Sequence, residues 1–244
     1  MKITAIRGIM LRCTCSPISD ALSTSTARQA LLVKIETDAG LYGIGEAFTY
    51  GAPLKIMKYL VEEQLGPMLI GQDPTEIEKH WNTMYWRTIA HGRRSMTMGA
   101  MSGIDIALWD LLGKAAHMPV CKLLGQHLDR VPSYASGGFY APGKDLHKLE
   151  EELEHYKDQG YRDMKIKIGR TLERSNAPLT YMANQACAVS VEEDYKRIEV
   201  AKQIVGSGKL LVEYIYLASE QHRIHTEIQP EHDQNNSGQT SVHI

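Results

Sequence analysis

The alternation of apolar and polar residues predicts three β-strands at the start of the chain, over residues 2–13, 30–37 and 41–47. Asp38-Ala39-Gly40 separates the second strand from the third and predicts a tight hairpin turn, because glycine readily adopts a positive φ. Between the first two strands, residues 16–28 are rich in Ser and Thr and predict a loop. Together these features predict an antiparallel meander.

A helical periodicity follows the predicted meander, over residues 53–63, 74–90 and 96–116. Asp73 comes directly before the second segment, and Pro74 is its first residue. This pair predicts a helix that is capped by the aspartate and has a proline in its first turn. The third helix is predicted to turn one face toward the core, where its alanines would let a neighbouring element approach closely. That face consists of Ala100, Ile104, Ala107, Leu111 and Ala115.

From residue 131 the pattern changes to short strands that alternate with helices. This alternation predicts parallel βα units. Residues 169–190 form a connection longer than the usual about 2–6 residues between a strand and a helix, and we interpret it as a functional loop over one end of the sheet. The strands are predicted at residues 132–136, 161–168 and 209–212, and the helices at residues 144–159 and 191–205.

Composition and charge restrict the kinds of molecule that the protein is expected to bind. The formal net charge is −2 and the basic residues do not cluster, so a nucleic acid is not expected. No apolar stretch reaches the about 20 residues that cross a bilayer, so a membrane is not expected either. The four cysteines are too sparse for a disulfide framework; we interpret them as buried small side chains in a protein of the reducing cytoplasm.

Three blocks of the sequence carry a resemblance to a known family. Residues 37–46, 100–115 and 160–169 occur in the same order as matching blocks of the enolase superfamily, and the chain resembles its mandelate racemase and muconate lactonizing enzyme branch. The resemblance implies an α+β capping domain, made of the meander and helices, followed by a (β/α) TIM-like barrel. Substrate would then bind between the two, at the carboxyl ends of the barrel strands.

The extent of these blocks predicts the domain boundaries. We expect a capping domain over residues 1–125, the first βα units of the barrel over residues 126–212, and an irregular or disordered polar tail over residues 213–244. Three parallel strands cannot close an eight-stranded barrel. The barrel is therefore expected to be incomplete, as in a truncated or frame-disrupted relative.

Two lysines form the most specific candidate site. Residues two apart in a strand project to the same side, so Lys165 and Lys167 should lie together, with Met164, Ile166 and Ile168 on the opposite side. Burial and a like-charged neighbour both favour a neutral lysine, so one of the two pKa values is expected to fall toward neutrality. The alternative interpretation is a half-exposed strand whose lysines face water.

The resemblance assigns chemistry to this pair. It implies removal of the proton alpha to a carboxylate, with Lys167 as the acid–base catalyst and Lys165 holding the substrate carboxylate beside Mg²⁺. Glu213 stands where the family has an aspartate that binds the metal, and we expect it to be a metal ligand despite its extra methylene group. Ile215 stands where the family has an asparagine.

The resemblance also implies that two capping-domain loops, at about residues 15–28 and 47–54, close over the substrate. Ser19 and Tyr50 lie in these loops and are predicted to contact the substrate.

Three functional interpretations remain open at this stage. The first is an enzyme that acts on a small hydroxy acid or sugar acid, either a lyase (a sugar-acid dehydratase) or an isomerase (a racemase). The second is a catalytically inactive truncated relative, because the later barrel strands and their metal ligands are not recognisable. The third is an interaction module that uses the exposed sheet edge and the long connection. The family often forms homo-oligomers, so the resemblance also implies a possible homo-oligomer.

Overall fold

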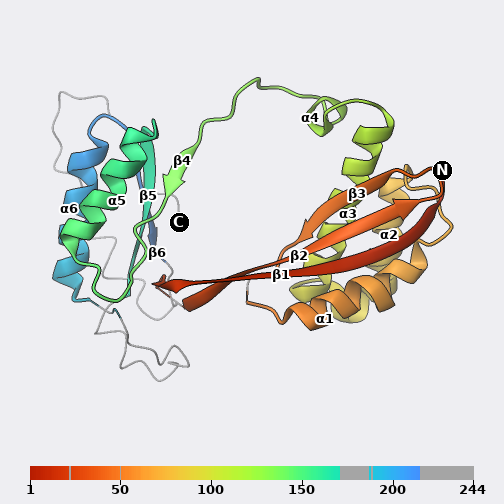
Figure 1. Cartoon of the computed structure of the whole chain (residues 1–244), viewed down its shortest axis with the longest axis horizontal. Helices are drawn as coiled ribbons and strands as arrows, with labels where there is room; N and C mark the ends of the chain where they lie inside the picture. The colour runs from red at the N-terminus through yellow and green to blue at the C-terminus, as the bar shows by residue number, and fades with distance from the viewer. Residues whose placement is uncertain (22, 50, 171–186, 188, 215–244) are drawn as a thin grey trace. The chain divides into compact units, whose positions relative to one another are not determined.

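The computed structural model describes residues 1–21, 23–49, 51–170, 187 and 189–214 (Figure 1). Within the chain, contacts define two compact units. The first unit comprises Met1–Thr14 and Ala27–Arg130, and the second comprises Cys15–Thr26 and Val131–Ile244. The tip of the hairpin formed by the first two strands therefore makes its contacts with the second unit.

A three-stranded sheet begins the fold, in the order β1 (Ile3–Ser19), β2 (Thr24–Thr37) and β3 (Tyr42–Ala47). β2 and β3 pair antiparallel, from Leu31 opposite Ala47 to Glu36 opposite Tyr42. The turn between them uses Gly40 at a φ of 77°, a conformation that glycine adopts without strain. The predicted meander is confirmed.

Helices cover one face of this sheet (Figure 1). α3 packs directly on β3, because glycines on the strand let the two backbones approach: a Cβ on Gly43 would lie 2.0 Å from the carbonyl oxygen of Ala107. Of the predicted core face of α3, the first four residues are fully buried, whereas Ala115 in the last turn is exposed. The helical elements are α1 (Leu54–Tyr59), the π-helical η1 (Leu60–Leu65), the 3-10 turn η2 (Gly66–Met68), α2 (Ile77–Gly92), α3 (Met96–Ala115) and α4 (Val120–Leu123).

Two local predictions about the first strands and helices were wrong. The polar stretch at residues 16–28 contains the ends of β1 and β2, because the hydrogen bonds of a strand ladder join backbone groups and tolerate polar side chains. α2 starts at Ile77, with no side-chain cap. The Asp73 carboxylate instead accepts hydrogen bonds from the amide and hydroxyl of Thr75 and closes a turn before the helix.

A parallel sheet forms the centre of the second unit, in the order β4 (Tyr134–Ser136), β5 (Asp163–Ile168) and β6 (Leu210–Tyr214). α5 (Leu146–Asp158) and α6 (Val191–Val205) pack on this sheet and on each other (Figure 1). This arrangement confirms the predicted parallel βα units. The buried apolar core is formed by Ala135, Leu149, Leu153, Met164, Ile166, Ala201, Ile204 and Val205.

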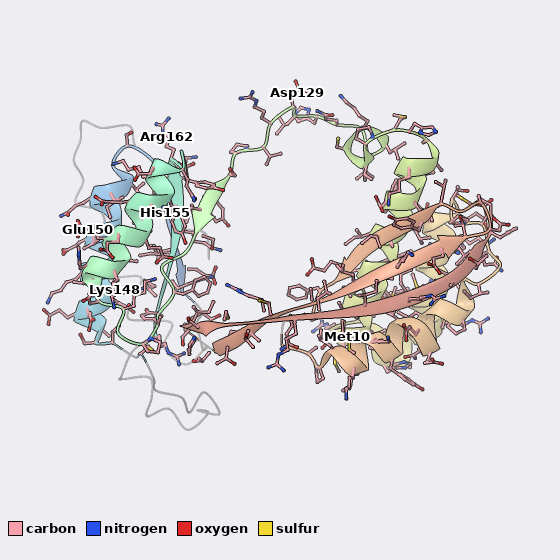
Figure 2. The ribbon with its side chains drawn as sticks, viewed as in Figure 1. Met10, Asp129, Lys148, Glu150, His155 and Arg162 are labelled. Atoms are coloured by element: carbon pink, nitrogen blue, oxygen red, sulfur yellow. The ribbon has the colours of Figure 1, made fainter. Side chains whose placement is uncertain are left out.

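Polar residues fix the starts and the outer face of these two helices. Asp145 caps α5 and Ser190 caps α6, each by accepting a hydrogen bond from a backbone amide of the first turn. Lys148, Glu150 and His155 are exposed on α5 (Figure 2). Helix caps and an apolar inner face thus set both helices against the sheet.

Two further observations concern the exposure of the cysteines and the length and apolar character of the helices. All four cysteines are free thiols, but Cys13 and Cys121 are exposed and the other two are partly exposed, so the interpretation as buried side chains was wrong. Residues 9–14 of β1 are exposed on both of its faces, which explains the exposure of Cys13. Among the helices of the described residues, none has the length and apolar character of a membrane-spanning segment.

Candidate active site

The two lysines lie on one side of β5, as their spacing predicted. On the opposite side, Met164 and Ile166 are buried in the core against α5 and α6. The same alternation places Lys165 and Lys167 on the face of β5 away from that core. Lys167 is the more deeply placed of the two, with 7% of its surface exposed.

Glu213 of β6 joins both lysines. β5 and β6 pair in parallel with Lys167 opposite Glu213. One carboxylate oxygen of Glu213 accepts a hydrogen bond from Lys167 Nζ, and the other lies 2.6 Å from Lys165 Nζ. The carboxylate therefore stands between two ammonium groups and offsets the repulsion between them.

The pKa values of this cluster follow from the shared carboxylate. Burial acts to lower the pKa of Lys165, but the hydrogen bond and the negative charge of Glu213 outweigh it and raise that pKa above its usual value. Burial likewise acts to raise the pKa of Glu213, yet the hydrogen bonds from both lysines and their charges lower it. The fall expected for the pKa of one of the two lysines is therefore not found at Lys165, which is held as a cation.

Aromatic side chains complete the surroundings of the pair. The ring centre of Phe139 lies 5.1 Å from Lys167 Nζ, and that of Tyr134 lies 5.3 Å from Lys165 Nζ. Rings at this distance attract a cation through their negative faces. Sequence reasoning missed both residues; the available signal was their position on and just after β4, the neighbour of β5 in the sheet.

Of the two residues predicted to contact the substrate, the structure describes Ser19 but not Tyr50. Ser19 is 1% exposed, and its hydroxyl shares a hydrogen bond of 2.8 Å with that of Thr24. Its backbone forms a bridge with Tyr140, through two hydrogen bonds of 2.7 and 2.9 Å. In this structure Ser19 thus joins the hairpin tip to the segment after β4. Tyr50 and Ile215 lie outside the described residues.

The described residues do not by themselves fit Mg²⁺. This ion favours about six oxygen ligands in an octahedron. Both oxygens of Glu213 are engaged by ammonium groups, and no group of three or more His, Cys, Asp or Glu side chains gathers within the described part of the chain. No step of the chemistry below is therefore derived from a metal.

Comparison with known proteins agrees with the fold. The family model of the mandelate racemase/muconate lactonizing enzyme N-terminal domain matches residues 4–125. An arabinonate dehydratase from Saccharolobus solfataricus is 35% identical over 178 residues, which are 73% of this chain and 43% of that protein. The chain thus spans less than half the length of this curated relative.

Solved structures show the same architecture. A member of the enolase superfamily from Polaromonas sp. JS666 superposes with a TM-score of 0.71 and 30% identity, over 87% of this chain and 51% of that one. L-talarate/galactarate dehydratase from Salmonella typhimurium LT2, liganded with Mg and L-lyxarohydroxamate, gives a TM-score of 0.70 and 26% identity, over 86% and 51% of the two chains. The chain belongs to the mandelate racemase and muconate lactonizing enzyme family of the enolase superfamily.

Proposed function

We propose that this chain contributes the first catalytic residues of a sugar-acid dehydratase, in which a proton alpha to a carboxylate is removed. The observation that carries the proposal is the cluster on adjacent parallel strands: Lys165 and Lys167 share the carboxylate of Glu213 at the carboxyl ends of β5 and β6. Relatives named for arabinonate and for talarate/galactarate support a sugar acid as the substrate class.

The two lysines suit different roles in this proposal. Lys165, held as a cation, would bind the substrate carboxylate and stabilise the charge that develops on it as the proton leaves. Lys167 would be the acid–base residue, since it is the more buried of the two. Lys167 donates a hydrogen bond to Glu213 and can accept a proton only as a neutral amine, so base action requires it first to lose a proton and to turn its free nitrogen toward the substrate.

Dehydration then follows from elementary chemistry. Lys167 takes the α proton, the bond from Cβ to its hydroxyl breaks, and that hydroxyl takes up a proton from protonated Lys167 or from solvent and leaves as water. The enol that remains tautomerises to a 2-oxo acid. Return of the proton to the opposite face would instead give racemisation, so both outcomes share the first step. Glu213 is proposed as a metal ligand, and Mg²⁺ would require further ligands in addition to it.

The remaining parts of the proposal follow the family. We propose that residues 1–125 form the capping domain and that residues 126–212 form barrel units. We also propose that the protein is a homo-oligomer in the cytoplasm. Tyr50 remains proposed as a substrate contact of the second capping loop, and Ser19 as part of the first.

An exchange experiment tests the proposed proton removal. The full chain is incubated with arabinonate and with galactarate in D₂O containing Mg²⁺, and NMR follows both α-deuteration and 2-oxo acid formation. We expect Lys167→Met to abolish both signals. Lys196→Met is the matched control, because Lys196 also forms an ion pair with a glutamate, at 2.8 Å, but on the exposed surface of α6. Absence of both α-deuteration and 2-oxo acid formation in the parent chain would reject the proposal for this chain.

A further inference from the structure

Two arginines are buried in the second unit and have no part in the proposed chemistry. Arg170 is 7% exposed and Arg197 is 2% exposed. Charged side chains are rarely buried unless they are paired or hydrogen-bonded, because the loss of hydration must be offset. The partners of these arginines therefore indicate what they hold in place.

Arg170 binds the hairpin tip, which consists of residues 15–21 and 23–26. Its Nη1 donates a hydrogen bond of 2.9 Å to the carbonyl oxygen of Asp20 and a longer one of 3.4 Å to that of Ser23. Its Nη2 donates to the hydroxyl of Thr24 at 3.0 Å. One planar guanidinium thus joins three residues on both sides of the tip, which a lysine ammonium cannot reproduce with the same geometry.

The backbone that carries Arg170 is itself fixed. Asp194 of α6 accepts a hydrogen bond of 2.8 Å from the amide of Gly169, where the chain leaves β5 at a φ of 89°. Tyr140 donates its hydroxyl to the same carboxylate at 2.6 Å and accepts a bond of 3.4 Å from the amide of Arg170. Arg197 supports this arrangement by pairing with Asp194 and donating to the carbonyl of Gly138 at 2.6 Å.

The segment after β4 provides a second attachment for the tip. The backbone of Tyr140 is hydrogen-bonded to that of Ser19, and the preceding residue, Phe139, places its ring against the ammonium of Lys167. The tip is therefore attached at two points, through the backbone of Tyr140 and through the side chain of Arg170, which follows Lys167 by three residues in the chain.

We infer that Arg170 is a positioning residue that fastens the hairpin tip at the carboxyl end of β5, next to Lys167. It contacts no reacting atom and acts through the tip. If the proposed function holds, on which this part of the inference rests, the tip is held where a substrate of Lys167 has to bind. The residue would then affect the binding of the sugar acid more than the chemical step.

Hydrogen exchange on the full chain, followed by mass spectrometry, tests the attachment without requiring activity. In Arg170→Gln, the amides of Ser19, Asp20 and Ser23 should exchange about tenfold faster or more, because bonds from a charged donor are lost. Amides of the sheet, such as that of Met164, should keep their protection, which separates local release of the tip from unfolding. Arg170→Lys should fall between the parent and the glutamine variant.

Arg162→Gln is the matched control. Arg162 lies just before β5, is exposed (Figure 2), and donates one long hydrogen bond of 3.5 Å to the carbonyl of Ser207. Its replacement should leave exchange at the tip unchanged. Thr24→Val provides a second test should Arg170→Gln not fold, since it removes one acceptor of Arg170 and should also speed exchange at the tip.

Unchanged exchange at the tip in a folded Arg170→Gln variant, or in Thr24→Val where the first does not fold, would overturn the inference.

Kinetics supply a second readout in a chain that turns over: Arg170→Gln should raise KM by about tenfold while kcat changes by less than about threefold. A fall in kcat with KM unchanged would contradict the positioning role. A parent chain without turnover rejects the proposed function, and the exchange experiment then decides on Arg170 by itself.

Discussion

Lys167 and Glu213 face each other across the parallel pair β5–β6 and are joined by an ion pair. The same carboxylate also binds Lys165, so one negative charge serves two positive ones. The cluster therefore keeps a net positive charge, which suits the substrate carboxylate of the proposed function. A shared partner of this kind makes the three residues energetically dependent on one another.

Replacement of Glu213 should reveal that dependence. Glu213→Gln removes the charge between two ammonium groups, one of them almost fully buried, and should lower the free energy of unfolding by about 1–3 kcal/mol. In the double variant with Lys165→Met, the repulsion disappears and part of the loss should be recovered. Urea denaturation of the four members of this cycle measures the coupling. Additive effects would contradict the shared carboxylate.

The same charges should control the binding of Mg²⁺. A cation at Glu213 must compete with both lysines for the carboxylate oxygens, so removal of one ammonium should favour the ion. At about 4 Å in an effective dielectric near 20, a unit charge is worth several kcal/mol, so Lys165→Met should raise Mg²⁺ affinity by about tenfold or more. Calorimetric titration of the full chain measures this change. Affinity that is equal in Lys165→Met and the parent would show that the ion binds elsewhere.

Close packing in the first unit allows a separate stability test. A Cβ on Gly45 would lie 2.1 Å from the carbonyl oxygen of Gly103, so Gly45→Ala should force β3 and α3 apart and destabilise the unit by about 1–3 kcal/mol or more. Glu46→Ala, at the next and exposed position of β3, is the control. Thermal unfolding of both variants checks the prediction. Equal midpoints would mean that the helix and strand do not approach as closely as described.

The spacing of apolar and polar residues predicted the strands and helices, but it did not predict which residues of different elements contact each other. The two-residue spacing of Lys165 and Lys167 predicted their common side, because it reflects the geometry of any strand. The partner of the two lysines could not be predicted in this way, because Glu213 lies 46 residues after Lys167 and no local pattern shows which residue of β6 pairs with Lys167. The pKa of Lys165 followed the partner and so departed from expectation.

Misplaced boundaries have a similar cause. Asp73 was predicted to cap α2, but its carboxylate binds Thr75 in a competing local turn, so the helix begins later. The polar stretch around Ser19 pairs as strand ends because its backbone finds partners in Tyr140 and the neighbouring strand. Side-chain composition does not show where backbone groups find partners far along the chain, and the contacts of Arg170 with the tip were missed for the same reason.

The cap of α5 should make the stability of the second unit depend on pH. The amide of Lys148 donates to the Asp145 carboxylate at 2.9 Å, and this hydrogen bond lowers the pKa of Asp145 below its model-compound value of 3.8. Because the pKa is lower in the folded state, the stabilisation is fully present above pH 3.8 and is lost as the pH falls through the folded-state value. Asp145→Asn retains a capping oxygen that does not titrate but lacks the charge, so its stability relative to the parent should be lowest at neutral pH and should rise as the pH falls through the folded-state pKa of Asp145.

Urea denaturation of the parent and of Asp145→Asn, from neutral pH to below pH 3.8, measures this difference. Asp158→Asn is the control, because Asp158 ends the same helix and is exposed there. It should show no acid-dependent gain over the parent. Parallel pH profiles for Asp145→Asn and the parent would mean that the Asp145 carboxylate has the same pKa in the folded and unfolded states, and that the charge of this cap does not stabilise α5.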